Sequence, residues 1–234
     1  MLLELILLQF IAHLSADFIF QSNGFIHKKC ASIFNRYHLY HFFIVGGLSY
    51  LCSLDFHFWG AALIIAGVHL FTDVGKGIWQ ISTKGQQTCF FIDQCVHITS
   101  FIIVAWGYST FCGIRFLVPM DIKILAIIAG FLFCSKPANI LIMNIFRLYS
   151  IQTDNEHCVS INSLPNAGRL IGVVERFLAL AMVILTQYEA VGLLIAAKSI
   201  LRFSDTQKTE YVLVGTLLSF AVALFTGVII NILG

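Results

Sequence analysis

The chain has 234 residues, of which 59% are hydrophobic and only 11% are charged, and its net charge at pH 7 is +2. Soluble domains carry roughly 25% charged residues, so this composition, with a mean hydropathy of +0.89, excludes an ordinary soluble protein. Lipid must therefore be the solvent for much of the surface. The sequence has no basic run with interleaved aromatic residues, so no nucleic acid is expected as a partner.

Apolar runs long enough to cross a membrane follow one another along the chain. About 20 apolar residues are needed to span the hydrocarbon core. Only helices or closed barrels satisfy the backbone there, and these runs are too long and too uniformly apolar for barrel strands. The sequence predicts an all-α, polytopic transmembrane helix bundle of about seven or eight helices, at residues 2–21, 38–54, 57–78, 91–112, 121–144, 170–188, 190–203 and 211–233.

These runs predict a single membrane domain over residues 1–234. Its parts are the first four helices, the fifth helix, a polar cytoplasmic loop and the last helices, at residues 1–112, 113–146, 147–168 and 169–234. The fifth run is interrupted by Lys136 and Pro137, which is typical of a bent or broken helix.

Lysine and arginine gather in alternate connections between the runs. The basic connections are residues 22–37, 79–90, 147–168 and 203–210. Cytoplasmic loops of membrane proteins carry an excess of these residues. The alternation predicts a multi-pass protein of the inner, cytoplasmic membrane with both termini outside.

Three pairs of histidine and aspartate, each four residues apart, lie inside apolar runs: His13/Asp17, His69/Asp73 and Asp93/His97. Four residues advance a helix by about 400°, so the two members of each pair share one face, one turn apart. Since the helices alternate in direction, all three pairs lie toward the basic-loop side. Ionised residues in a membrane cost about 2.5–3.5 kcal/mol each and normally have polar partners. The sequence therefore predicts a polar site at the cytoplasmic leaflet, where His38 and His41 also begin the second helix.

Imidazole and carboxylate are the ligands of Zn, Mn or Fe, and a metal site with an open position activates water for hydrolysis. We expect a divalent metal bound by His13, Asp17, His69, Asp73, Asp93 and His97. The candidate catalytic carboxylates are Asp17, Asp73, Asp93 and Glu175. No spacing matches a specific zinc signature such as H-E-x-x-H, so the metal is a hypothesis.

Basic residues in the last third of the chain are expected on the same side of the membrane as the three His/Asp pairs. Arginine and lysine suit phosphate and other anions. We expect an anion or substrate site from Arg169, Arg176, Lys198, Arg202 and Lys76. Glu175 is expected as a base or, by preference, as the ion-pair partner of Arg169 or Arg176.

Six motifs resemble a family of bacterial integral membrane proteins known only as domain of unknown function 3307 (DUF3307). They are H-L-S-A-D-F-I-F-Q, H-L-F-T-D-V-G-K, D-Q-C-V-H, G-R-L-I-G-V-V-E-R-F, K-S-I-L-R-F and Y-V-L-V-G-T-L-L-S, at residues 13–21, 69–76, 93–97, 168–177, 198–203 and 211–219. The family brings no activity with it. The two H-L-x-x-D helices are also similar to those of predicted membrane-bound metal-dependent hydrolases, a resemblance that favours metal-dependent hydrolysis.

The leading expectation is a metal-dependent membrane hydrolase or transferase acting on an anionic or lipid-linked substrate. A transporter or channel could use the same residues as an ion or proton site, but transporter sites usually lie near the bilayer midplane at broken helices. A third reading is a membrane subunit that docks a soluble cytoplasmic partner through residues 150–167. The expected partners are the lipid bilayer and either a second copy of the chain or that soluble protein.

Overall fold

The computed structural model of the chain describes residues 1–22, 24–25, 34–82, 86–149, 167–202 and 209–234. Within these ranges every regular element is a helix, which confirms the all-α fold expected from the sequence. The chain divides into two compact units, Met1–Ala129 and Gly130–Gly234. The single membrane domain over residues 1–234 stays a prediction.

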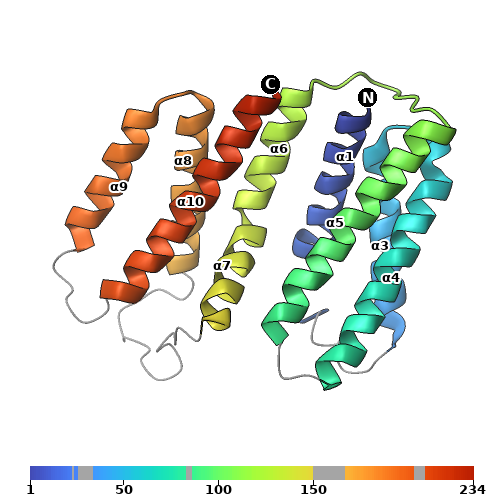
Figure 1. Cartoon of the computed structure of the whole chain (residues 1–234), viewed down its shortest axis with the longest axis horizontal. Coiled ribbons are helices and arrows are strands. Elements are labelled where there is room, and N and C mark those ends of the chain that lie inside the picture. Colours follow the sequence, from blue (N-terminus) through green and yellow to red (C-terminus); the bar gives the residue numbers. More distant parts are fainter. Residues whose placement is uncertain (23, 26–33, 83–85, 150–166, 203–208) are drawn as a thin grey trace. The chain divides into compact units, whose positions relative to one another are not determined.

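Long helices that contact one another in pairs build the first unit (Figure 1). They are α1 (Leu2–Leu14), α3 (Arg36–Ser53), α4 (Trp59–Ser82) and α5 (Gln86–Phe111). α1 packs against α3 and α5, and α4 packs against the same two helices. Each helix therefore has two neighbours, and buried side chains such as Leu5, Ala62 and Phe101 form one apolar core between them. The core fixes how the polar faces of these helices meet.

Two local features shape the polar end of this unit. α1 continues directly into a π-helical turn, η1 (Ser15–Ile19), which places Asp17 in a wider turn than an α-helix would. α3 begins with a capping box, in which the Asn35 side chain accepts a hydrogen bond from the Tyr37 amide at 2.9 Å. The His38 ring completes the box through Nδ1, which accepts from the Asn35 amide at 3.3 Å. His38 thus caps its own helix.

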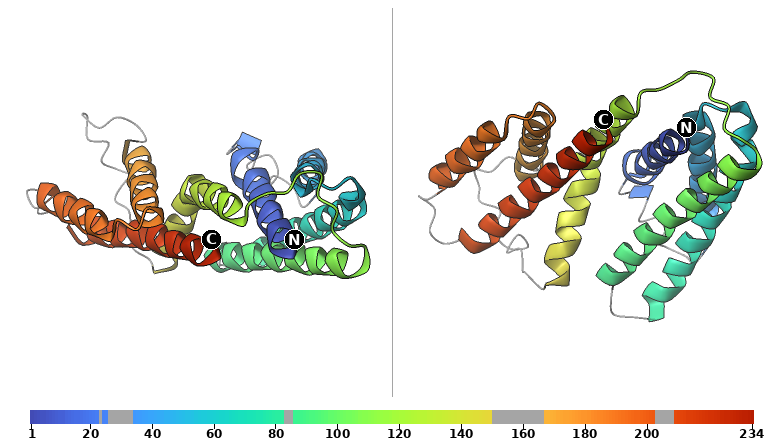
Figure 2. Two further views of the ribbon diagram at one scale, coloured as in Figure 1. Left: turned by 90° about the horizontal axis from the view of Figure 1, so that it is seen from above. Right: turned by 45° about the horizontal axis from the view of Figure 1, so that its top comes forward.

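The second unit contains α7 (Lys136–Leu148), α8 (Ala167–Ile184), α9 (Tyr188–Arg202) and α10 (Thr209–Leu233) (Figure 2). α10 packs against α8 and α7, and α9 packs against α8. Gly227 permits the close approach of α10 to α8, since a Cβ atom there would lie 2.5 Å from Cγ1 of Val183. Alanine at this position would force the two helices apart.

A bend of 48° separates α6 (Ile122–Cys134) from α7. Pro137 stands in the first turn of α7, where its missing N–H is tolerated but a continuous helix from the preceding turn is not. The interruption predicted at Lys136 and Pro137 is confirmed as a break between two helices.

Four helical segments of the described chain are long and apolar enough to cross a membrane, or five if the bent pair α6–α7 is one span. They are Leu2–Ile19, Phe56–Trp79, Thr88–Phe111 and Leu213–Leu233. The expected count of seven or eight is not confirmed. α3 opens on Arg36 and two histidines, α8 carries three charged residues, and α9 has only 15 residues, so these three helices are too polar or too short.

Candidate metal centre

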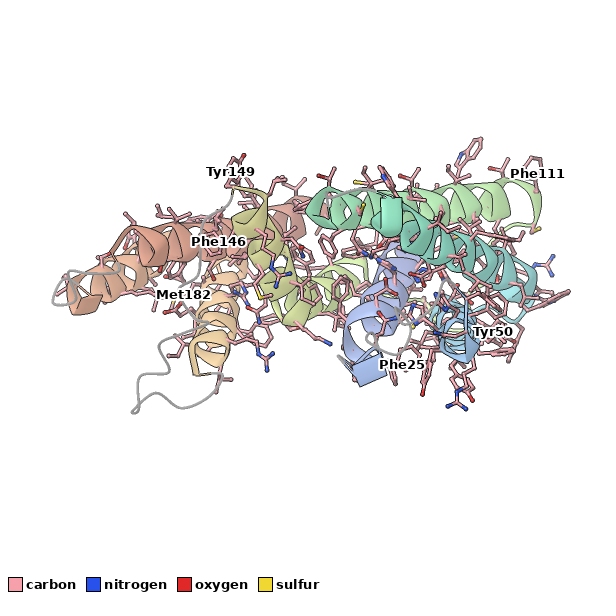
Figure 3. The ribbon with its side chains drawn as sticks, turned by 90° about the horizontal axis from the view of Figure 1, so that it is seen from below. Phe25, Tyr50, Phe111, Phe146, Tyr149 and Met182 are labelled. Atoms are coloured by element: carbon pink, nitrogen blue, oxygen red, sulfur yellow. The ribbon has the colours of Figure 1, made fainter. Side chains whose placement is uncertain are left out.

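The polar cluster of the first unit is built by four helices that each bring one or two side chains to the same place. The i,i+4 spacing puts His13 and Asp17 on one face of α1 and its π turn, and His69 and Asp73 on one face of α4. α3 adds His41, whose ring is buried between the other two helices and contacts His69 at 4.9 Å between centroids. The ring of Phe25, which is labelled in Figure 3, lies 6.4 Å from the His41 ring between centroids.

At the centre of the cluster, two imidazole nitrogens and two carboxylate oxygens converge. Nε2 of His41 lies 3.0 Å from Nε2 of His69, and the two nitrogens lie 3.1 and 3.2 Å from Oδ1 of Asp17. Oδ2 of Asp73 lies 3.8 and 3.7 Å from the same two nitrogens. All four side chains are at least 89% buried, with exposures of 2%, 4%, 11% and 9%.

These separations match the edges of a metal coordination shell. Four ligands held about 2.0–2.2 Å from one zinc ion at tetrahedral angles lie about 3.3–3.6 Å from one another. The observed range of 3.0–3.8 Å brackets that value. The donor set also fits, because two imidazoles with two carboxylates suit Zn, Mn or Fe. His41 and His69, together with either Asp17 or Asp73, therefore have the spacing of three ligands of one divalent ion.

His13 lies one step away from this centre. Its Nδ1 is 3.9 Å from Oδ2 of Asp17, and its Nε2 is 3.3 Å from Oε1 of Gln94 on α5. His13, Asp17 and His69 also offer ligand atoms within 4.8 Å of one another. We take His13 as an alternative ligand, or as the partner that orients the Asp17 carboxylate.

A second group of polar side chains joins α4 to α5. Nε2 of His97 lies 3.2 Å from Oδ1 of Asp93, while Oδ2 of Asp93 accepts a hydrogen bond from Nζ of Lys76 at 2.8 Å. The His97 ring stacks on the His69 ring, with 3.8 Å between centroids and 13° between planes. Asp73, Asp93 and His97 again offer three ligand atoms within 4.8 Å of one another. The two groups are thus continuous through Asp73.

An uncharged hydrogen-bonded pair closes the cluster on the side toward the middle of α1. Nε2 of Gln9 donates to the Ser49 carbonyl at 3.0 Å, and the Ser49 hydroxyl donates to Oε1 of Gln9 at 2.6 Å. Both residues are 2% exposed. Gln9 precedes His13 by one helical turn, so the polar face of α1 changes there from charged to neutral groups.

The structure brings together all six predicted metal ligands and Lys76, whose roles stay predictions. Sequence reasoning did not include His41 among the ligands, although it stands three residues after His38 on the same helix. It also missed Gln9, Ser49, Thr72 and Gln94. Thr72 and Gln94 adjoin Asp73 and Asp93 in the sequence, so position alone could have drawn attention to them.

The basic residues of the second unit have other partners. Arg176, which is 2% exposed, donates from Nε to the Cys134 carbonyl at 2.8 Å and from Nη2 to Oδ1 of Asn139 and the Ser135 carbonyl at 2.5 and 3.4 Å. Its Nη1 donates to the Ser219 hydroxyl at 3.1 Å. The carbonyls belong to the α6–α7 break, so Arg176 satisfies acceptors that an unbroken helix would pair internally.

The remaining predicted anion ligands differ in their surroundings. Lys198 forms an ion pair with Glu175, whose sequence-based partner was instead Arg169 or Arg176. Arg169 is exposed at the start of α8. The side chain of Arg202 lies outside the described residues. The anion-binding role of all four basic residues stays a prediction.

Asp55, between α3 and α4, is a buried carboxylate that the sequence reasoning did not single out. It accepts hydrogen bonds of 2.9 Å from the amides of His57 and Arg115 and from the Tyr108 hydroxyl. Burial alone would raise the pKa of Asp55, but these hydrogen bonds outweigh it and hold the pKa below its ordinary value. Asp55 therefore ties the start of α4 to α5 and to the segment that follows α5.

Comparison with known proteins gives one match. Residues 5–118 match the model of a family described as "Protein of unknown function (DUF3307)". No curated protein and no solved structure matches the chain. The matched range contains the whole polar cluster, whereas the motifs at residues 168–177, 198–203 and 211–219 lie beyond it.

Proposed function

We propose that residues 5–118, which match the model of the DUF3307 family, form a membrane-embedded, metal-dependent hydrolase or transferase acting on an anionic or lipid-linked substrate. The observation that carries the proposal is the convergence of His41, His69, Asp17 and Asp73 at 3.0–3.8 Å. A helix bundle in lipid has no ordinary reason to bury four such groups against one another, because each costs free energy unless it is paired.

The proposed roles follow from position and charge. His41, His69, Asp17 and Asp73 hold the ion, which when bound would polarise a phosphoryl or carbonyl oxygen and lower the pKa of a bound water. Asp17 and Asp73 are the more exposed of the four at 11% and 9%, so the substrate would approach from their side. Asp93 serves as a further ligand or as the base.

Lys76 is the candidate contact for an anionic substrate. Its side chain is 27% exposed, and its Nζ lies 2.8 Å from Asp93 at the edge of the cluster. Arg176 and Lys198 are already engaged with backbone carbonyls and with Glu175. Lys76 is itself paired with Asp93, but of these three basic residues it is the one that adjoins the cluster, so the proposal assigns anion binding first to Lys76. A phosphate ester of a lipid is the substrate class that combines an anion with membrane burial.

Transport is the second candidate, favoured by the broken helix α6–α7. In transporters the carbonyls of such a break coordinate the coupling ion. Here the carbonyls of Cys134 and Ser135 accept hydrogen bonds from Arg176. These carbonyl groups are thus satisfied by the protein itself, and hydrolysis is the better supported function.

The third alternative was a subunit that docks a soluble partner through residues 150–167. Of this segment, residues 150–166 lie outside the part of the chain that the structure describes.

Metal content and turnover of the purified full-length protein test the proposal together. We expect one tightly held Zn, Mn or Fe ion per chain and hydrolysis of a chromogenic phosphodiester, bis(p-nitrophenyl) phosphate, in detergent or in vesicles. Asp73→Asn should remove most of the turnover, because the amide cannot supply a charged ligand oxygen. His41→Ala should remove the ion.

The matched controls are His57→Ala and Asp121→Asn, which change an exposed histidine and an exposed aspartate away from the cluster. Both should retain metal and turnover. Purified protein without Zn, Mn or Fe, and without a thermal shift when these ions are added, would overturn the proposal. Ion-driven current or uptake in proteoliposomes that Asp73→Asn abolishes would favour transport instead.

A further inference from the structure

His97 is held in one tautomer by the residue before Asp73. Thr72 Oγ1 lies 2.9 Å from the His69 carbonyl and 3.1 Å from the Val68 carbonyl, the usual acceptors for a threonine hydroxyl within a helix. When the hydroxyl hydrogen is donated to one of these carbonyls, Thr72 accepts from Nδ1 of His97, 3.1 Å away. A neutral His97 then carries its proton on Nδ1 and a lone pair on Nε2.

That lone pair faces a second acceptor. Nε2 of His97 lies 3.2 Å from Oδ1 of Asp93, yet neither atom has a hydrogen-bond partner among the described residues. The side chains are 1% and 5% exposed. The other oxygen of Asp93 is engaged by Lys76 at 2.8 Å and by Gln94 at 3.2 Å. Two buried acceptor atoms this close together, with no hydrogen bond between them, are unfavourable unless a cation lies beside them.

We propose that Asp93, His97 and Asp73 bind a second divalent cation, so that the cluster is a two-ion centre with Asp73 as the shared carboxylate. The inference rests on the proposed function for the first ion. Ligand atoms of these three residues lie within 4.8 Å of one another. The His69 and His97 rings, one from each site, are stacked 3.8 Å apart. The ligands of the two sites are therefore in direct contact, as in two-metal hydrolytic sites, whose ions lie roughly 3.5–4 Å apart.

Charge balance indicates when the second ion binds. Asp17, Asp73 and Asp93 contribute −3 and Lys76 contributes +1, so the cluster has a net charge of −2 with neutral histidines. One divalent cation neutralises it, and a second leaves a charge of +2 in a largely buried site. An anion that bridges the two ions would offset that charge. The second ion is therefore expected to bind more weakly and together with a phosphate group, as two-ion phosphoester hydrolysis requires.

Manganese titration of the full-length protein tests the second site without a turnover assay. The bound ions are counted by metal analysis, and electron paramagnetic resonance distinguishes an isolated Mn²⁺ from a coupled pair. We expect one isolated ion without anion, and two coupled ions when inorganic phosphate is added. Asp93→Asn should remove the coupled signal and keep the first ion, and His57→Ala should keep both.

Thr72→Val provides a milder variant that leaves every ligand in place. It removes only the acceptor that fixes the His97 tautomer and should weaken the second ion by about 10-fold or more, with the first unchanged. One ion per chain with or without phosphate would overturn the second site and leave the proposed function standing. No bound ion at all would overturn both. Two uncoupled ions, or a coupled pair unaffected by Asp93→Asn and Thr72→Val, would also overturn this assignment.

Discussion

The two units of the chain bury ionisable side chains in opposite ways. In Met1–Ala129, His41, His69, Asp17 and Asp73 face one another at 3.0–3.8 Å. In Gly130–Gly234, the buried Arg176 faces backbone carbonyls, an amide oxygen and a hydroxyl. The first arrangement gathers groups that are close enough to hold a metal ion, whereas the second satisfies its charged group with hydrogen bonds.

The difference follows from the hydrogen-bonding groups that the helix backbone presents to a buried side chain. A broken helix exposes carbonyl oxygens, which are acceptors, so a guanidinium with five N–H donors can be satisfied by backbone alone. Carboxylates are acceptors too, and no carbonyl can stabilise them. Buried carboxylates therefore need donors or cations: Asp55 accepts from two amides and a hydroxyl, whereas Asp17 and Asp93 face histidine nitrogens and Asp93 also faces Lys76. A buried arginine at a helix break thus indicates a structural joint, whereas several buried carboxylates with imidazoles indicate a binding site.

The largest effect is expected from Arg176→Met, which removes the donors at the α6–α7 break but keeps much of the side-chain volume. The carbonyls of Cys134 and Ser135 lose their partner in a buried environment. We expect a loss of about 3–5 kcal/mol in the free energy of unfolding, typical of removing one partner from a buried charged network. Thermal unfolding in detergent measures it.

Arg169→Met is the matched control, because Arg169 is exposed on the same helix. It should unfold like the wild type. Equal stability of the two variants would show that the break does not depend on Arg176, and the structural half of the comparison would fail.

Metal binding by the cluster of the first unit is tested by measuring how added metal ions change the stability of the protein. At a free metal concentration of 100 times the dissociation constant, a bound ion stabilises the folded state by about 2.7 kcal/mol. Wild-type protein should show a corresponding rise in Tm on addition of Zn or Mn. Asp17→Asn should lose most of that rise, since Oδ1 of Asp17 contacts both central histidines.

Asp121→Asn is the control, and its Tm should rise on metal addition by as much as the Tm of the wild type. A rise in Tm that survived in Asp17→Asn would place the ion elsewhere in the chain.

Asp55 provides a smaller, pH-dependent effect in the first unit. Its pKa is lowered in the folded state, so its contribution to stability is complete above the ordinary value of about 3.9 and is lost as the pH falls through the lowered pKa. Asp55→Asn should cost about 1–3 kcal/mol at pH 7, because it weakens three buried hydrogen bonds. Unfolding followed from pH 7 to pH 2 should show the wild type losing its advantage over this variant only below about pH 4.

Much of the fold could be predicted from the sequence, since apolar runs of about 20 residues have few alternatives to helices in lipid. The break at Lys136 and Pro137 was also readable, because proline cannot continue a helix. The span count was not. α8 and α9 read as apolar segments, but charge in the first and length in the second keep them from qualifying as spans.

Only the parts of the site that lie on one helix could be predicted from the sequence, because helical periodicity relates residues of the same helix. Spacing of four residues places His69 and Asp73 on one face, and this needs no structure. The contact of His41 with both Asp17 and His69 depends on how α3 packs between α1 and α4, which no local pattern encodes. The same applies to Arg176: its sequence position suggests an exposed clamp, whereas helix packing buries it against a break 40 residues earlier in the chain.

The smallest effect is expected at the ion pair of Glu175 with Lys198, which joins α8 to α9. The two side chains are 15% and 16% exposed, so solvent screens the pair only in part, and we expect a contribution near the upper end of the range of about 0.2–1 kcal/mol typical of exposed pairs. Glu175→Gln and Lys198→Met should each lower stability by no more than this, and the double variant should lose little beyond either single one, because both remove the same contact. Turnover and metal content should be unchanged in the two single variants and in the double variant, since Glu175 acts as the ion-pair partner of Lys198. If Glu175→Gln lost turnover while unfolding like the wild type, and Lys198→Met did not, Glu175 would instead act as a catalytic carboxylate. The second unit would then take part in the reaction.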